Sequence, residues 1–65
     1  MTTLELRRIL GISQASVMNW IKEGMPATRT GYQYELNKDD VKAWLMERQQ
    51  DSKFSDFYRI LVEKL

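Results

Sequence analysis

The side chains that could do chemistry in this 65-residue chain are amides, hydroxyls, carboxylates and cations, since the sequence has neither histidine nor cysteine. It therefore lacks the commonest general base and metal ligand and any thiol nucleophile. Asp39, Asp40, Glu35 and Ser13 remain as candidates, but the two aspartates and the serine stand at predicted helix starts, where such residues are structural. No acid, base and nucleophile converge, so we expect neither an enzyme nor a bound cofactor or metal ion.

Polar and small side chains gather on one face of a helix predicted over 14–23. On a helical wheel this outer face and its flanks carry Gln14, Ala15, Ser16, Met18, Asn19 and Lys22. Gln14 and Asn19 have the paired donor and acceptor that read adenine in the DNA major groove. Ala15 or Met18 can touch a thymine methyl group, and Lys22 can reach a phosphate. A solvated helix face explains the same pattern equally well.

Two short predicted helices position that face. The first begins at Thr2, which can form a capping box with Glu5, and ends at Gly11. The second begins after Ser13 as N-cap and ends at Gly24. Their apolar stripes are Leu6, Ile9 and Leu10 in the first, and Val17, Trp20 and Ile21 in the second. Two helices joined by a short turn with a glycine are the sequence form of a helix-turn-helix.

A short β-hairpin is predicted directly after the second helix. Pro26 prevents helix there, and two stretches around a turn at Gly31 have the pattern of strands. Tyr32, Tyr34 and Leu36 alternate onto one face, with Tyr34 expected in the core. The hairpin is placed like the wing of a winged helix-turn-helix, where it would touch sugar-phosphate or an adjacent minor groove. The expected contacts are Arg29, Thr30 and Tyr32; a simple connector is the alternative.

Two further helical stretches follow the hairpin. Asn37 is the predicted N-cap of the first, with Asp39 and Asp40 in a turn where the helix dipole favours negative charge. Its buried stripe is predicted to be Val41, Trp44 and Leu45. We expect Trp20, like Trp44, to pack in the core rather than to stack on bases. Near Ser52 the apolar pattern lapses, and the last stretch either continues the preceding helix or breaks from it.

The last helix has a wider apolar face than packing on its own domain needs. Five residues fall within about 100° of one another; they are Phe54, Phe57, Tyr58, Leu61 and Leu65. Ile60 and Val62 widen the arc to about 200°. We therefore expect a DNA-binding domain over 1–50 and, over 51–65, an amphipathic helix that binds a second copy or another partner. A helix buried within the monomer, or a segment of a longer protein, is the alternative.

The charge distribution supports nucleic-acid binding weakly. The formal net charge is +1 and the pI is about 8.0, whereas dedicated nucleic-acid domains often exceed a pI of about 9. Up to Tyr34 there are four basic residues against two acidic ones, and afterwards six against seven. The small basic excess thus lies on the half proposed to bind DNA. A protomer that neutralises about three phosphates binds weakly, so a homodimer or a cooperative array is expected.

From Gly11 to about Arg48 the sequence resembles the winged helix-turn-helix group that includes MerR-type regulators, phage excisionases and the terminase small subunit of lambda-like phages. The motifs that look most like the terminase small subunit are Gly11-Ile12-Ser13, Ser16-Val17, Asn19-Trp20 and Gly24-Met25-Pro26. The motifs that look more like the MerR wing and its following helix are Arg29-Thr30-Gly31-Tyr32-Gln33-Tyr34 and Asp39-Asp40-Val41. The resemblance implies a recognition helix from Gln14 to Glu23 and a wing around Thr30-Gly31.

The sequence thus predicts a mainly α fold with a small β-hairpin wing, in the order helix, turn, helix, hairpin, helix, helix. The function expected is sequence-specific binding of double-stranded DNA by a phage or mobile-element protein in the cytoplasm of a bacterial host. It is most like the DNA-recognition domain of a terminase small subunit, which serves DNA packaging. An excisionase or a small transcriptional regulator is the alternative, and from another class, a protein-interaction module that uses the C-terminal helix. A large terminase subunit or an integrase is a possible partner, and no membrane is expected.

Overall fold

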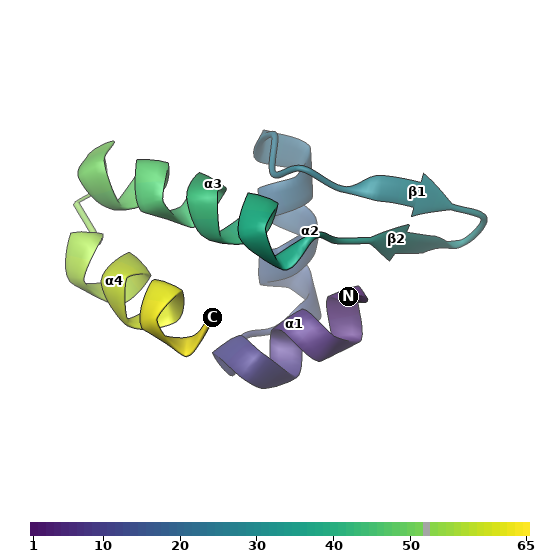
Figure 1. The fold of residues 1–65 in the computed structure, drawn as a ribbon, viewed down its shortest axis with the longest axis horizontal. Helices are drawn as coiled ribbons and strands as arrows, with labels where there is room; N and C mark the ends of the chain where they lie inside the picture. Colours follow the sequence, from purple (N-terminus) through teal and green to yellow (C-terminus); the bar gives the residue numbers. More distant parts are fainter. Residues whose placement is uncertain (52) are drawn as a thin grey trace.

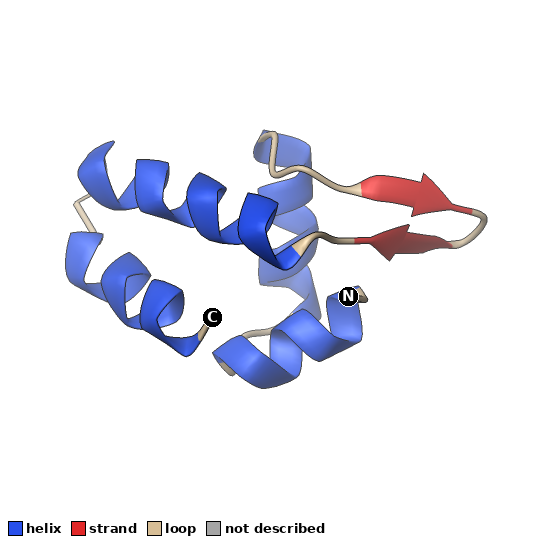
Figure 2. Ribbon diagram, viewed as in Figure 1, coloured by secondary structure: helices blue, strands red, loops and turns tan. Residues whose placement is uncertain are grey.

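The computed structural model describes residues 1–51 and 53–65, and within them four helices and one two-stranded hairpin follow one another (Figure 1). The elements are α1 (Thr3–Leu10), α2 (Gln14–Glu23), β1 (Thr28–Thr30), β2 (Gln33–Glu35), α3 (Lys38–Asp51) and α4 (Ser55–Lys64). The domain measures 34 × 21 × 21 Å, with the hairpin at one end and the α3/α4 pair at the other (Figure 2). The mainly helical fold and the predicted order of elements are confirmed. That order differs from the usual one of winged helix-turn-helix proteins.

Local caps determine where α1 and α2 begin and end. Thr2 Oγ1 accepts the Glu5 amide at 3.2 Å, and Ser13 Oγ accepts the Ser16 amide at the same distance. Gly11 and Gly24 end the two helices with φ of 67° and 118°, a left-handed backbone that favours glycine. The predicted pair of helices with a short intervening turn is therefore confirmed.

The hairpin is shorter than the sequence pattern indicates. β1 and β2 are antiparallel, with Arg29 opposite Tyr34, and the turn between them contains Gly31 and Tyr32. Because Tyr32 lies in the turn, it does not share a packed face with Tyr34 and Leu36, and that expectation was wrong. Tyr32 is 102% exposed, Tyr34 is half-buried, and Leu36 is buried.

The start of the chain is held against the hairpin. Thr2 forms an antiparallel bridge with Glu35, and the Leu36 amide donates to the Met1 carbonyl at 2.7 Å. These bonds join residues more than thirty positions apart, so they place the beginning of α1 beside the end of β2.

The last two helices are separate elements that run alongside each other (Figure 1). Asn37 Oδ1 caps α3 as predicted, accepting the amides of Asp39 at 2.9 Å and Asp40 at 3.1 Å. The helix ends at Asp51 and α4 begins at Ser55. The sequence pattern leaves open whether the preceding helix continues or breaks near Ser52. That residue lies outside the described residues.

One core unites all four helices. Its buried members are Leu6, Leu10, Val17, Trp20, Met25, Leu36, Val41, Leu45, Tyr58 and Leu61. The predicted stripes are largely confirmed, although Ile9 is exposed and Ile21 and Trp44 are partly buried against the core. Since Tyr58 and Leu61 come from α4, this helix packs with the domain predicted over 1–50 as one unit.

Truncation of a core side chain should test this packing. We expect Leu45→Ala to lower the free energy of unfolding by about 2–5 kcal/mol, because it removes a fully buried side chain and leaves a cavity. A domain of this size has about 3–10 kcal/mol in total, so the variant should be close to unfolding. Urea denaturation followed by circular dichroism measures the change. Met46→Ala, at the exposed next position, should stay within about 0.5 kcal/mol; an equal loss in both variants would contradict the core assignment.

Candidate nucleic-acid interface

The outer face of α2 is presented to solvent as its sequence pattern indicates. Gln14, Ala15, Asn19 and Lys22 are exposed, while Ser16 and Met18 are half-buried. Val17 and Trp20 anchor the opposite face in the core. Among the described residues the side chains of Asn19 and Lys22 have no hydrogen bond or ion pair, so both can bind a ligand without breaking an existing side-chain contact.

The two predicted adenine readers differ in their surroundings. Gln14 Oε1 accepts a hydrogen bond from Arg7 Nη1 at 3.3 Å, which turns the carbonyl end of this amide toward α1. Reading adenine uses both ends of an amide, one to donate and one to accept. Asn19 has both ends available, whereas Gln14 offers its NH2 group with the oxygen already engaged. Asn19 is therefore the stronger base-reading candidate.

Ser16 belongs to the cap of its own helix. Its hydroxyl lies 3.0 Å from the Ser13 hydroxyl, and its amide donates to the same atom. The sequence places Ser16 on the flank of the DNA-facing surface, and the structure adds that its side chain is part of the N-cap. A contact with DNA would therefore use a hydroxyl that already has a local partner.

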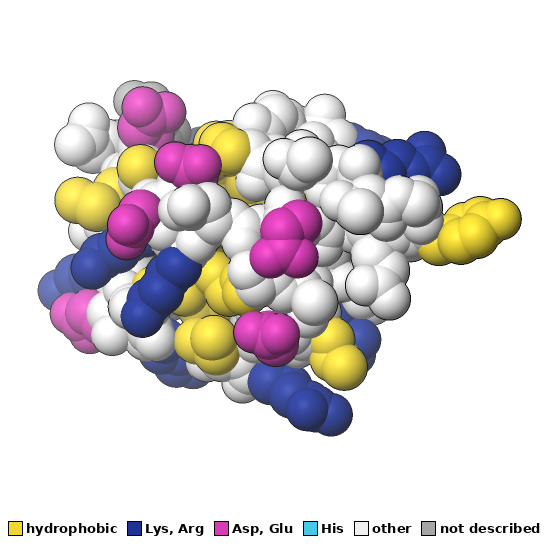
Figure 3. Space-filling view, turned by 45° about the vertical axis from the view of Figure 1, so that its right-hand side comes forward, with side chains coloured by type: hydrophobic (Ala, Val, Ile, Leu, Met, Phe, Trp, Pro, Cys, Tyr) yellow, Lys and Arg dark blue, Asp and Glu magenta, His cyan; other side chains and the backbone are white. Residues whose placement is uncertain are grey.

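The hairpin tip (29–32) carries a cation and an exposed aromatic ring. Arg29 Nε donates to the Gly31 carbonyl at 3.2 Å, which shapes the turn and keeps the guanidinium at the tip. Thr30 and Tyr32 are both exposed. Figure 3 shows a hydrophobic side chain standing out from the body at the hairpin end, near a basic one. Acidic and basic side chains are interspersed over the rest of this face.

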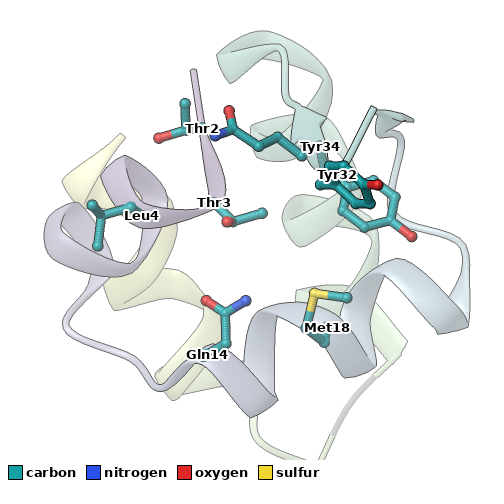
Figure 4. A pocket seen from close by; sticks show the side chains of 8 residues that line it. Thr2, Thr3, Leu4, Gln14, Met18, Tyr32 and Tyr34 are labelled. Carbon is teal, nitrogen blue, oxygen red and sulfur yellow. The ribbon is translucent and has the colours of Figure 1, made fainter. Parts of the chain in front are cut away.

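A hollow of about 330 Å³ separates α2 from the hairpin. Eight residues from the start of α1, from α2 and from the hairpin line it (Figure 4): Thr2, Thr3, Leu4, Gln14, Met18, Tyr32, Gln33 and Tyr34. Sequence reasoning selected Gln14, Met18 and Tyr32 for DNA contact and missed Thr3, Leu4 and Gln33. No local signal points to these three, because the bridge between Thr2 and Glu35 brings them together.

Arg48 ties the end of α2 to the last two helices. Its Nη1 lies 2.6 Å from Glu23 Oε2, and its Nε donates to the Tyr58 hydroxyl at 3.2 Å. The guanidinium also lies over the rings of Trp44 and Tyr58, 4.7 and 5.5 Å from their centroids. The hydrogen bond with Tyr58, with a smaller contribution from Glu23, raises the pKa of Arg48 above its usual value. The cation of Arg48 therefore links α2, α3 and α4.

The apolar residues of the last helix divide between the core and the surface. Tyr58 and Leu61 are buried within the protomer and Leu65 is partly buried, which corrects the expectation that they form a dimerisation surface. A helical wheel shows which residues of this helix are apolar. It cannot show which part of the apolar arc faces the rest of the protein. Phe54 is 68% exposed and Phe57 is 47% exposed, and Ile60 is similarly open at 48%. We call these three residues the outer face of α4.

Other kinds of site were also sought in the described part of the chain. It contains no group of three or more acidic side chains placed to hold a metal ion. No helix within 1–51 and 53–65 is long and apolar enough to cross a membrane.

No protein-family model, curated protein sequence or solved structure matches the chain. The inference of function therefore depends on the geometry described above.

The two hairpin tyrosines should differ in their effect on stability. We expect Tyr34→Ala to lower the free energy of unfolding by about 1–2 kcal/mol, because its half-buried ring packs in the angle between hairpin and helices. About 1 kcal/mol corresponds to a fall of roughly 4–8 °C in Tm for a domain of this size. Tyr32→Ala should leave Tm unchanged, since that ring is fully exposed. Thermal melts of both variants measure this, and a large loss in Tyr32→Ala would contradict the geometry of the tip.

Proposed function

We propose that this protein binds double-stranded DNA through α2 in the major groove and the hairpin tip on the sugar-phosphate backbone or in the adjacent minor groove. The proposal depends most on one observation, that the side chains of Asn19 and Lys22 are exposed and have no hydrogen bond or ion pair among the described residues. They stand, without partners among the described residues, on the outer face of a helix whose inner face is fixed in the core. A rigid helix with an uncommitted amide and a cation is suited to reading base edges.

The hairpin adds a second DNA contact in this proposal. Arg29 can enter a narrow minor groove, where negative potential attracts guanidinium groups. The exposed Tyr32 ring can pack on sugars. The arrangement then works as a winged helix-turn-helix in which the wing follows the recognition helix directly and two helices come after it.

The modest net charge of +1 limits the affinity of one protomer. With about three phosphates neutralised per protomer, log K would fall with log salt at a slope near −3. We therefore propose that two copies bind together through the outer face of α4. Two large aromatic side chains are exposed at this face, and exposed apolar patches mark sites of protein association.

Two kinds of biological role fit this DNA-binding mode, and one candidate comes from a different class. DNA packaging, as in a terminase small subunit with a large terminase subunit as partner, is the first that we propose. Excision beside an integrase, or transcriptional regulation, is the second. A protein-interaction module that works through the outer face of α4 is the candidate from a different class, and the exposure of Phe54 and Phe57 favours it.

Substitution of Asn19 should show whether α2 reads DNA bases or serves only as a scaffold. The full chain is used to select duplexes from a random library, and the enriched site is titrated at fixed salt. We expect Asn19→Ala to weaken binding to that site by about 1–3 kcal/mol, because it removes a bidentate contact with one base. Gln50→Ala removes an exposed amide at the far end of α3 and should bind like the parent. If no duplex is enriched, or if both variants bind equally, the proposal fails.

Two isoleucines test the dimer. They are exposed to similar extents, 48% for Ile60 on α4 and 41% for Ile9 on α1. We expect sedimentation equilibrium to show self-association of the parent and of Ile9→Asp, and a monomer for Ile60→Asp, because a carboxylate at the paired face would have to be desolvated. A monomeric parent, or equal behaviour of both variants, would remove the dimer from the account.

A further inference from the structure

We propose that the hollow between α1, α2 and the hairpin seats the sugar-phosphate backbone of one DNA strand and holds it with uncharged hydrogen-bond donors. The inference rests on the proposed DNA binding and extends it to residues that lie outside the recognition helix and the tip. It assigns Thr3 and Gln33 to contacts with the DNA backbone. It also changes the role of Gln14 from reading adenine to holding the backbone.

With α2 in the major groove and the hairpin tip in the adjacent minor groove, duplex DNA places a strand between the two elements. The major and minor grooves are separated by one sugar-phosphate backbone, so a helix in the first and a hairpin tip in the second must lie on either side of that strand. α2 supplies Gln14 and Met18 to one side of the hollow, and the hairpin supplies Tyr32 and Tyr34 to another (Figure 4). The hollow is therefore the space between the two proposed DNA-contacting elements.

The lining has the chemistry of a sugar-phosphate site. Phosphate oxygens accept hydrogen bonds and cannot donate them, and the lining offers donors in its hydroxyls and amides, from Thr2, Thr3, Gln14, Tyr32, Gln33 and Tyr34. No carboxylate belongs to the lining residues, so none of them repels an anion. Leu4 and Met18 supply apolar surface that suits deoxyribose, which lacks the 2′-hydroxyl of RNA.

Gln14 is oriented for this role. Because its Oε1 accepts from Arg7, its NH2 group remains as the donor, and Figure 4 shows the amide directed into the hollow. Arg7 behind it adds a positive charge close to the same place. A phosphate gains from both the free NH2 group and the nearby charge.

The volume is consistent with one backbone unit. About 330 Å³ corresponds to roughly ten water molecules at about 30 Å³ each. That is more than a single phosphate ion needs and is of the order of a sugar with its phosphate. The hollow is thus large enough for one sugar with its phosphate.

Uncharged contacts with phosphate can be told from charged ones by the salt dependence of binding. Lysine and arginine contacts release counterions, and each adds about one unit to the slope of log K against log salt. A hydroxyl or amide contact contributes affinity without changing that slope. It also contributes equally to all base sequences, because the backbone carries no sequence information.

The test compares isosteric variants that remove donors. Thr3→Val and Gln33→Met alter the hollow, while Thr28→Val and Gln50→Met make the same changes at exposed positions outside its lining. Fluorescence anisotropy with the selected duplex and a scrambled one is recorded from 50 to 200 mM salt. We expect each hollow variant to bind both duplexes about tenfold more weakly with the parent's salt slope, and the controls to match the parent. Arg29→Ala should lower the slope by about one.

A scan of methylphosphonate linkages provides a measurement on the unaltered protein. Neutralising the phosphate between the two contacted grooves should weaken binding of the parent and have little further effect on Thr3→Val. Circular dichroism confirms that the variants are folded. If Thr3→Val and Gln33→Met bind like the parent while Asn19→Ala loses binding, the hollow does not seat the strand, although DNA binding stands. If no linkage between the grooves is sensitive, the inference also fails. A parent that binds no duplex overturns the proposed function itself.

Discussion

The packing of Trp20 is the interaction on which the rest of the structure depends. Its ring is buried on the inner face of α2, with the rings of Trp44 and Tyr58 at centroid distances of 5.9 and 6.3 Å. These contacts place α2 against both C-terminal helices, and the cation of Arg48 closes the same cluster through Glu23 at the end of α2. In a domain this small a single cluster of aromatic rings can fix the orientation of a helix. The inner face of α2 is committed by this packing, and its outer face is left available for a ligand.

Features with local causes could be predicted from the sequence. The caps at Thr2, Ser13 and Asn37 and the helix ends at Gly11 and Gly24 follow from hydrogen bonds or backbone angles within a few residues. The position of the hairpin follows for the same reason. The register of β2 could not be predicted from the sequence. A turn that is displaced by one residue moves Tyr32 from a packed face to the hairpin tip.

Features with long-range causes could not be predicted. Periodicity marks the apolar arc of α4, but the fit against α1 and α3 decides that Tyr58 is buried while Phe57 is exposed. The hollow depends on the bridge from Thr2 to Glu35, and the orientation of Gln14 depends on Arg7 of another helix. The same contacts change which residues of the candidate site are suited to read bases and which are suited to hold the backbone. In the proposed DNA complex, Asn19 is the residue that reads a base, and much of the remaining surface is suited to bind a phosphate backbone without many charges.

An NMR titration of the isotope-labelled full chain with its selected duplex tests the central claim most directly, because it reports on every amide at once. The account predicts that the largest chemical-shift changes fall on the outer face of α2, on the hairpin tip and on the start of α1, where the hollow opens. Residues of the buried core near Leu45 should change little. Shifts confined to the outer face of α4, with α2 and the hairpin unaffected, would contradict the account and favour a protein-interaction module.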